Sequence, residues 1–267
     1  MTQTQPGRLS RRSLLAGALA AGFVGSSCRS AGPTTVVEAA PTAASLTAGS
    51  PFYIAHRGGG GNWPEMTAYA YEQATKIKGL QALEISVCLS SDGVLVCSHD
   101  PTTKRVTGVD YTIAKETWAT LSKLRTTAAF TTDPTQPARP LARLDDIVER
   151  YIDRYVLFIE PKVPPAEEPL MRRLTSLLNP ERVVWKQVLT SSRFGEAKDV
   201  GFTTWGYVLD YPEFLGGNLT RLSSDPKIDM LGIPVLGPAR IIEAASSAAA
   251  ENGKKTIAWP ITIKAER

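Results

Sequence analysis

The sequence predicts an α/β fold built on one sheet of parallel strands. Short apolar segments typical of buried strands alternate with amphipathic segments along most of the chain. Seven strands take part in this alternation, and one further strand belongs to a hairpin. Residues with catalytic chemistry stand at or just after strand ends, where barrels of alternating strands and helices place their active sites. We therefore expect a (β/α)8 TIM-type barrel, rather than a doubly wound sheet, that lacks its last βα unit.

The strands are expected where β-branched, aromatic and other apolar residues cluster between turn signals. The first strand, Phe52–His56, precedes the glycine-rich loop Gly58–Gly61. This loop does not match a dinucleotide-binding motif, because Trp63 stands where the third glycine should be. The expected strands are 52–56, 80–87, 94–98, 155–160, 182–189, 203–209, 230–235 and 256–262.

The helices are expected between these strands. Pro64 and Glu65 suit the first turn of a helix that extends to about residue 78, because proline is favoured there and glutamate interacts well with the helix dipole. The polar, proline-containing segment 126–139 is expected to be a surface loop. Further helices are expected over 110–124, 141–151, 168–178, 191–200, 213–219 and 238–252.

A tight hairpin turn around Asp92 and Gly93 is expected to join two of the strands. If these are the two loop residues, Cys88 lies opposite Cys97, close enough for side-chain contact. A disulfide there would suit an exported protein, whereas buried cysteines also serve as small apolar residues. The sequence leaves both alternatives open. The chain has three cysteines, which are too few and wrongly spaced for a structural zinc site.

Residues 1–28 have the pattern of an export signal. Arg11 and Arg12 form a twin-arginine pair, and an uncharged run from Ser13 to Ser27 follows. This run has the length of a signal-peptide apolar region and is shorter than the roughly 18 residues of a spanning helix. An amphipathic helix of a cytoplasmic protein is the alternative, but the run has no polar face. Cys28 stands in a context similar to a lipoprotein cleavage box, so we expect an exported cell-envelope protein, either lipid-anchored at Cys28 or secreted.

Residues 29–51 are rich in serine, alanine, proline and threonine and lack hydrophobic periodicity, which predicts a flexible linker. The barrel domain is expected over residues 52–267. The formal net charge of +4 includes arginines of the predicted signal, and no basic stripe with interleaved aromatic residues is present. We therefore expect no nucleic-acid partner, and membrane contact only through the candidate lipid anchor.

The only histidines of the chain, His56 and His99, both follow strand-like segments. Histidine titrates near neutral pH, so such a pair can supply a general acid and a general base to one reacting centre. Taken alone, each histidine is better explained as a core residue. The predicted barrel, however, brings both to the same mouth, which favours a catalytic site.

Glu84 and Glu160 also stand at strand ends and could bind a hard cation such as Ca²⁺ or Mg²⁺ through oxygen. Arg57 and Lys162 place positive charge beside them, which suits a phosphate group. Together with paired histidines, a cation and basic residues indicate cleavage of a phosphoester.

Several segments together resemble the glycerophosphodiester phosphodiesterase family. The resemblance extends from residue 52 to about residue 262 and includes a strand that ends at Trp259. The segments that carry it are Ile54-Ala55-His56-Arg57-Gly58, Pro64-Glu65, Leu83-Glu84-Ile85-Ser86-Val87, Ser91-Asp92-Gly93-Val94-Leu95-Val96, His99-Asp100, Arg105-Val106-Thr107-Gly108 and Ile159-Glu160-Pro161-Lys162.

The resemblance implies a metal-dependent phosphoric diester hydrolase on a (β/α)8 barrel. Its small-molecule substrates would be glycerophosphodiesters, which are cleaved to an alcohol and glycerol phosphate. His56 and His99 match the general acid and base, and Arg57 and Lys162 match residues near the phosphate. A substrate hydroxyl would attack phosphorus to give a cyclic phosphate that water then opens, so proximity would supply much of the acceleration.

The resemblance also implies that Glu84 and Glu160 are ligands of a divalent cation, Ca²⁺ or Mg²⁺. The chain departs from the family pattern at Ser86, where the family has a third, aspartate ligand, and Glu65 is a candidate to replace it. It departs again at Met66, where the family has asparagine, and at the last helix and strand, which we expect to be absent. Ser86 and the missing last unit support an alternative function: a catalytically impaired envelope lipoprotein that keeps the barrel as a binding or structural module. A phospholipase-like enzyme that cleaves lipid phosphodiesters is the third hypothesis.

Overall fold

The structure is a computed structural model that describes residues 39–49, 51–215 and 217–259. The predicted export signal, with its twin arginines and Cys28, lies outside the described residues. Among those that are described, no helix is long and apolar enough to cross a membrane.

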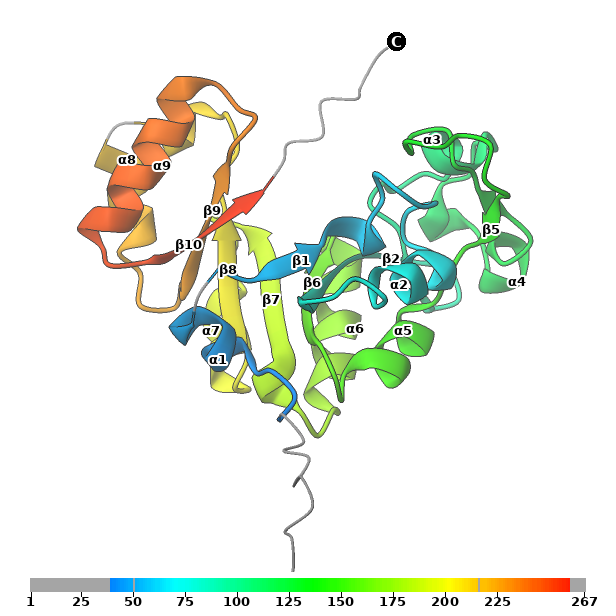
Figure 1. Cartoon of the computed structure of the whole chain (residues 1–267), viewed down its shortest axis with the longest axis horizontal. Helices are drawn as coiled ribbons and strands as arrows, with labels where there is room; N and C mark the ends of the chain where they lie inside the picture. Colours follow the sequence, from blue (N-terminus) through cyan, green and yellow to red (C-terminus); the bar gives the residue numbers. More distant parts are fainter. Residues whose placement is uncertain (1–38, 50, 216, 260–267) are drawn as a thin grey trace, which may run out of the picture. The chain divides into compact units, whose positions relative to one another are not determined.

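The predicted α/β barrel is confirmed. Its parallel strands are hydrogen-bonded in the order β1-β2-β6-β7-β8-β9-β10, and β3 pairs antiparallel with β2. In the described part of the chain, no eighth parallel strand joins β10 to β1, so the curved sheet is open there (Figure 1). The strands are β1 Tyr53–Ala55, β2 Leu80–Leu89, β3 Leu95–Cys97, β6 Val156–Pro161, β7 Val183–Val188, β8 Thr203–Tyr207, β9 Met230–Pro234 and β10 Lys255–Trp259.

Helices cover the outer face of this sheet. In Figure 1, α8 and α9 lie beside β9 and β10, whereas α2, α5 and α6 lie beside β2 and β6. A short antiparallel ribbon, β4 Arg125–Thr126 and β5 Arg139–Pro140, closes the predicted surface loop. The helices are α1 Ala43–Ala48, α2 Ala68–Ala74, α3 Lys104–Thr107, α4 Trp118–Leu121, α5 Leu144–Tyr151, α6 Pro164–Thr175, α7 Phe194–Asp199, α8 Gly217–Ser223 and α9 Ala239–Glu251.

The single helix predicted over 110–124 is wrong. The structure has a 3₁₀ turn, Ile113–Lys115, and then α4, with Glu116 extended between them. The side chain of Thr117 accepts a hydrogen bond from the backbone N–H of Thr120 and so begins a new helix. Side-chain capping therefore divides a segment whose composition alone suits one helix.

Helix α2 also begins later than expected. The side chain of Thr67 caps it by accepting from the backbone N–H of Ala70. Met66, just before this cap, has a φ of 59°, a left-handed conformation that a side chain disfavours. The chain therefore turns sharply between Pro64 and the helix, which keeps Glu65 beside the glycine-rich loop and outside the helix.

Helix α1 lies within residues 29–51, which were predicted to be a flexible linker. This prediction is wrong for Ala43–Ala48. Thr42 and Ser45 form a capping box in which each side chain accepts a hydrogen bond from the other's backbone N–H. Ala43 and Leu46 are buried in an apolar cluster with residues from β2, β6, β7, β8, β9 and β10. A helix this short gives little periodicity in sequence, and its stability comes from this packing.

Alternation along each strand separates an outer face, under the helices, from an inner face. On β2, Leu83 and Ile85 belong to the large core on the helix side, whereas Ala82 belongs to the cluster that also holds Leu46. Toward the carboxyl ends of three strands, the inner face changes from apolar to polar. Its residues are Ala82, Glu84 and Ser86 on β2, Val156, Phe158 and Glu160 on β6, and Val184 and Lys186 on β7.

The β2–β3 hairpin has a longer loop than expected. Ser90 and Val94 are joined by a backbone hydrogen bond, which leaves three residues between them and not two. Cys88 therefore pairs with Val96, and Cys97 with Val87. This one-residue shift puts the two cysteines on opposite faces. Both are free, buried thiols in different apolar clusters, so the candidate disulfide is wrong.

Candidate active site

The loop after β1 places His56 and Arg57 beside the end of β2. The backbone N–H of Arg57 donates to Oε2 of Glu84 at 2.7 Å. Arg57 has a φ of 54°, so its backbone is in the left-handed region, and this charge-assisted hydrogen bond offsets the resulting strain. Glu84 thus positions the loop that carries the first predicted catalytic residue.

A chain of charged side chains connects His99 to Arg57. Nδ1 of His99 lies 2.8 Å from Oδ1 of Asp100, and Nε of Arg105 donates to Oδ2 of Asp100 at 2.5 Å. Nη2 of Arg105 also donates to Glu65 at 2.5 Å, and Nη1 of Arg57 lies 3.3 Å from the same carboxylate. Glu65 therefore holds two guanidinium groups, and these ion pairs disfavour its predicted role as a metal ligand.

The charges of this network explain its pKa shifts. Burial raises the pKa of Glu65, but the hydrogen bond from Arg105 and the charge of Arg57 outweigh burial and leave it below its ordinary value. Burial likewise raises the pKa of Asp100, while His99 and Arg105 hold it well below the usual range. Because an ionised Asp100 can only accept, Nδ1 of His99 carries the hydrogen, and Nε2 is free to exchange a proton with a ligand.

Both histidines have pKa values below the ordinary 6.5. Burial lowers the pKa of His56 to about 4, and this effect exceeds the opposing attraction of Glu84. Burial also lowers the pKa of His99, but the hydrogen bond to Asp100 works against this shift. Without ligand, His56 is therefore held neutral, and His99 has a carboxylate that stabilises its protonated form.

At the centre of the polar inner face, Lys186 lies between the two predicted metal ligands. Its Nζ is 2.7 Å from Oε1 of Glu84 and 2.6 Å from Oε2 of Glu160. The Lys186 side chain is 7% exposed. Burial lowers its pKa, but the two carboxylates more than compensate and keep it above the ordinary value. All three groups are therefore charged.

Glu160 has further partners at the mouth of the barrel. The ammonium of Lys162 and the hydroxyl of Tyr207 both donate to Oε1 of Glu160, at 2.8 Å and 2.7 Å. Tyr207 also packs edge-on against Trp259 at the end of β10, with the ring centroids 5.4 Å apart. Burial raises the pKa of Glu160, but Lys186 and Lys162 bring it down to about 2. The mouth of the barrel thus contains the ammonium groups of Lys162 and Lys186 together with aromatic side chains.

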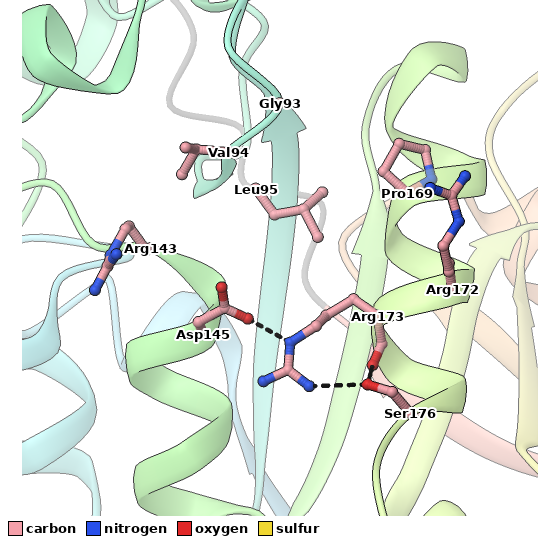
Figure 2. A pocket seen from close by; sticks show the side chains of 9 residues that line it. All are labelled: Gly93, Val94, Leu95, Arg143, Asp145, Pro169, Arg172, Arg173 and Ser176. Carbon is pink, nitrogen blue, oxygen red and sulfur yellow. Dashed lines mark hydrogen bonds and ion pairs between the residues drawn. The ribbon is translucent and has the colours of Figure 1, made fainter.

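A cavity of about 170 Å³ opens at the carboxyl ends of β6, β7 and β8, lined in part by Glu160, Lys162, Gln187 and Tyr207. A larger cavity of about 480 Å³ lies elsewhere, between the β2–β3 hairpin and helices α5 and α6 (Figure 2). In that cavity Arg173 is already paired with Asp145 and Ser176. The smaller cavity belongs to the candidate active site, because Glu160 and Lys162 line it, whereas His56 and His99 are not among its lining residues.

The residues present do not fit a divalent cation. Ca²⁺ and Mg²⁺ take about six or more oxygen ligands, which include waters, but the carboxylates that hold them must be free to do so. Here the facing oxygens of Glu84 and Glu160 already contact an ammonium, and the hydroxyl of Ser86 donates to Glu84 at 3.2 Å. Within the described residues, no group of three or more histidine, cysteine, aspartate or glutamate side chains could hold a metal ion.

The structure brings His56, Arg57, Glu84, Ser86, His99, Glu160 and Lys162 to one end of the sheet, as the sequence predicts. It adds Lys186, Tyr207, Asp100 and Arg105, to which sequence reasoning gave no role. The importance of Lys186 could have been predicted from the sequence. A lysine inside the apolar strand Val183–Val188 is rarely buried without a charged partner, and its alternation with Val184 places it on the inner face.

The model of the Glycerophosphoryl diester phosphodiesterase family matches residues 56–207, more than half of the chain. The chain belongs to this family. The match begins at His56 and ends at Tyr207, so every residue of the site described above except Trp259 falls within it. The family is one of phosphoric diester hydrolases, which agrees with the predicted class of enzyme.

Two curated relatives carry the same description. A "Glycerophosphodiester phosphodiesterase" of Bacillus subtilis is 27% identical over 139 residues, covering 50% of this chain and 47% of that protein. A "Probable glycerophosphodiester phosphodiesterase 1" of Mycobacterium tuberculosis is 34% identical over 125 residues, covering 45% of each. The chain therefore spans about half the length of the curated relatives that it matches.

Solved structures show the same fold. A glycerophosphodiester phosphodiesterase of Thermotoga maritima aligns with a TM-score of 0.63 at 19% identity, covering 80% of this chain and 88% of that one. An Oleispira antarctica phosphodiesterase, solved with the product sn-glycerol-3-phosphate, aligns with a TM-score of 0.58 at 24% identity, covering 79% and 85%. At these identities the structural similarity shows that the chain has the same fold as these proteins. It shows nothing about substrate or mechanism.

Proposed function

We propose that this family member hydrolyses glycerophosphodiesters to an alcohol and glycerol phosphate. The observation that carries the proposal is that the family match contains all the predicted catalytic and phosphate-binding residues, and the fold gathers them at one mouth. The relative from Oleispira antarctica, with its glycerol phosphate product, supports this substrate class. The mouth also offers a buried donor: among the described residues, Nε of Arg57 has no hydrogen-bond partner.

His56 and His99 divide the proton transfers according to their surroundings. His56, which burial keeps neutral, accepts the proton of the substrate hydroxyl as this hydroxyl attacks phosphorus. His99, whose protonated form Asp100 stabilises, donates a proton to the departing alcohol oxygen. Arg57 and Lys162 bind the phosphate oxygens and stabilise the charge that develops there. The two histidines then exchange roles when water opens the cyclic phosphate.

The test is release of glycerol phosphate from glycerophosphocholine by the parent and by His56→Ala and His99→Ala. Loss of one proton-transfer group is expected to lower kcat by about 10²–10⁴-fold. Circular dichroism of each variant checks that the fold is kept. Absence of activity in the folded parent, over a range of pH and with added Ca²⁺ or Mg²⁺, would support the impaired binding module instead.

A second candidate substrate is a lipid phosphodiester that keeps an acyl chain. Exposed apolar side chains follow the two strands beside the mouth: Tyr211 and Leu215 after β8, and Val235 and Leu236 after β9. Asp210, in the loop after β8, pairs with Arg240 in the first turn of α9. An acyl chain could lie on this surface while the phosphate is bound at Lys162. Cleavage of a lysophospholipid in preference to glycerophosphocholine would identify this substrate.

We also propose that the protein is exported and anchored in the cell envelope through Cys28. The proposal rests on the twin-arginine pattern and the apolar run before this cysteine. An anchor would place the enzyme beside the lipids whose breakdown supplies glycerophosphodiesters. Cys28→Ala is expected to move the protein from the membrane to the soluble fraction, with a loss of acyl mass. An unchanged distribution would show that Cys28 carries no anchor.

A further inference from the structure

Lys186 occupies the position between the two carboxylates that were predicted to bind a cation. It stands on the inner face of β7, and its ammonium contacts Glu84 on β2 and Glu160 on β6, at 2.7 Å and 2.6 Å. The ammonium also lies 5.3 Å and 5.4 Å from the ring centroids of Trp205 and Tyr207. Carboxylates on two sides and aromatic rings beside it are the surroundings that a cation favours.

A divalent cation would have to use the same carboxylate oxygens. It would then lie within a few ångströms of the Lys186 ammonium, and two such charges repel strongly in a buried site. Nearby groups do not offer a replacement ligand set. Glu65 is held by Arg57 and Arg105, and Ser86 supplies a neutral hydroxyl that donates to Glu84.

Without a metal ion, the two carboxylates and Lys186 have the same net charge as the metal-bound site that the family pattern implies. Glu84, Glu160 and Lys186 together carry a net charge of minus one. Three carboxylates around one divalent cation carry the same net charge. A serine at position 86 removes one negative charge, and a lysine in place of the divalent cation removes one positive charge. Ser86 and Lys186 together therefore keep the net charge at minus one, whereas either change alone would alter the net charge by one unit.

We propose that the ammonium of Lys186 is the built-in cation of this site and that the enzyme cleaves its phosphodiester without a divalent metal ion. This proposal rests on the proposed hydrolase function. Lys186 holds Glu84, which accepts the backbone N–H of Arg57, and Glu160, which accepts from Lys162 and Tyr207. It thereby positions both phosphate-binding residues from within the barrel.

Calorimetric titration of chelator-treated protein with Ca²⁺ and with Mg²⁺ tests the proposal without an activity assay. The parent is expected to show no binding at millimolar cation and no change in melting temperature. The double variant Ser86→Asp/Lys186→Met should bind about one cation and melt at a higher temperature when the cation is present. Ser86→Asp alone keeps the ammonium and should not bind.

Lys198→Met is the control, because it unpairs Asp229 at a half-buried lysine–carboxylate pair away from the mouth. It should gain no cation binding. If the double variant does not fold, Lys186→Met alone takes its place. Cation binding by the parent that is lost in Glu84→Gln would overturn the proposal. If neither the double variant nor Lys186→Met binds a cation, Lys186 is not the group that excludes the cation.

Activity separates this proposal from the function on which it rests. The parent should hydrolyse glycerophosphocholine at the same rate, within about two-fold, in EDTA and in Ca²⁺. Activity that is abolished by EDTA and restored by a cation contradicts the built-in cation but supports the hydrolase. No activity under any condition contradicts the hydrolase, while calorimetry still decides whether Lys186 excludes the metal ion.

Discussion

At the residue scale, the pairing of His99 with Asp100 makes the clearest prediction about chemistry. Asp100→Asn removes the carboxylate that orients the ring and favours its protonated form. We expect kcat/KM to fall by about 100-fold or more. The pH profile should also move. Because Asp100 raises the pKa of His99, its loss should shift the alkaline limb of kcat/KM to lower pH.

The control is Asp110→Asn, which removes an exposed carboxylate paired with Lys104. It should leave both the rate and the pH profile unchanged. If Asp100→Asn lowers the rate but leaves the alkaline limb in place, Asp100 serves the fold or substrate binding, and the acid role of His99 is wrong.

Glu65 gives a second prediction at this scale, because it holds Arg57 and Arg105 together. Glu65→Gln removes the charge that anchors Arg57 beside the phosphate. A charge-assisted hydrogen bond contributes about 1.5–3 kcal/mol, so KM is expected to rise by about 10-fold or more while kcat changes less. Glu72→Gln, which affects an exposed carboxylate paired with Arg150, is the control. An equal fall in kcat with constant KM would contradict the anchoring role.

The histidines, the arginine and the glutamates could be predicted as site candidates, because each stands at a strand end and matches the family pattern. Sequence reasoning missed Lys186 because its ion pair with Glu160 depends on strand order. β7 is next to β6, and only this neighbour relation brings residue 186 to Glu160. The ion pairs of Glu65 could not be predicted, because the direction of a loop side chain depends on the turn at Met66, which periodicity does not describe.

At the element scale, alternation predicted the strands well, and local side-chain hydrogen bonds explain most errors. Thr117 divides a predicted helix, and Ser90 lengthens the hairpin loop by one residue. A one-residue change reverses the faces of every side chain beyond it, which is why the cysteine pairing failed although both strands were predicted.

Helix α1 makes a prediction about stability. Leu46 is 4% exposed and packs inside the sheet, so Leu46→Ala should lower the free energy of unfolding by about 2–4 kcal/mol. Leu178→Ala is the matched control, since Leu178 is 95% exposed. Urea unfolding of the three proteins measures the difference. Equal effects of the two substitutions would mean that α1 does not pack on the barrel.

At the scale of the whole molecule, the barrel could be predicted because candidate catalytic residues follow many different strands. That distribution suits a fold whose parallel strands all end at one mouth. The site makes the folded protein less stable at acid pH, because a buried histidine at the mouth resists protonation. His56 has a pKa of about 4 in the folded protein, whereas an unfolded chain has the ordinary value of 6.5.

This difference makes the stability of the barrel depend on pH. Between pH 6.5 and 4 the unfolded chain binds a proton that the folded protein does not, so the free energy of unfolding should fall as the pH falls. The loss from His56 amounts to at most about 3 kcal/mol. His99 adds to it in the same direction, because its pKa is also lowered. The carboxylates act in a lower window, since Glu160 has a pKa of about 2 and an ordinary value of 4.5.

Urea unfolding at pH 7, 6, 5 and 4.5 measures this dependence in the parent and in His56→Asn, which cannot take up the proton. The variant should lose less stability than the parent between pH 7 and 4.5. The comparison removes the contribution of His99, because both proteins keep it. Parallel curves would mean that His56 titrates alike in the folded and unfolded states, and hence that it is not held neutral as its role as general base requires.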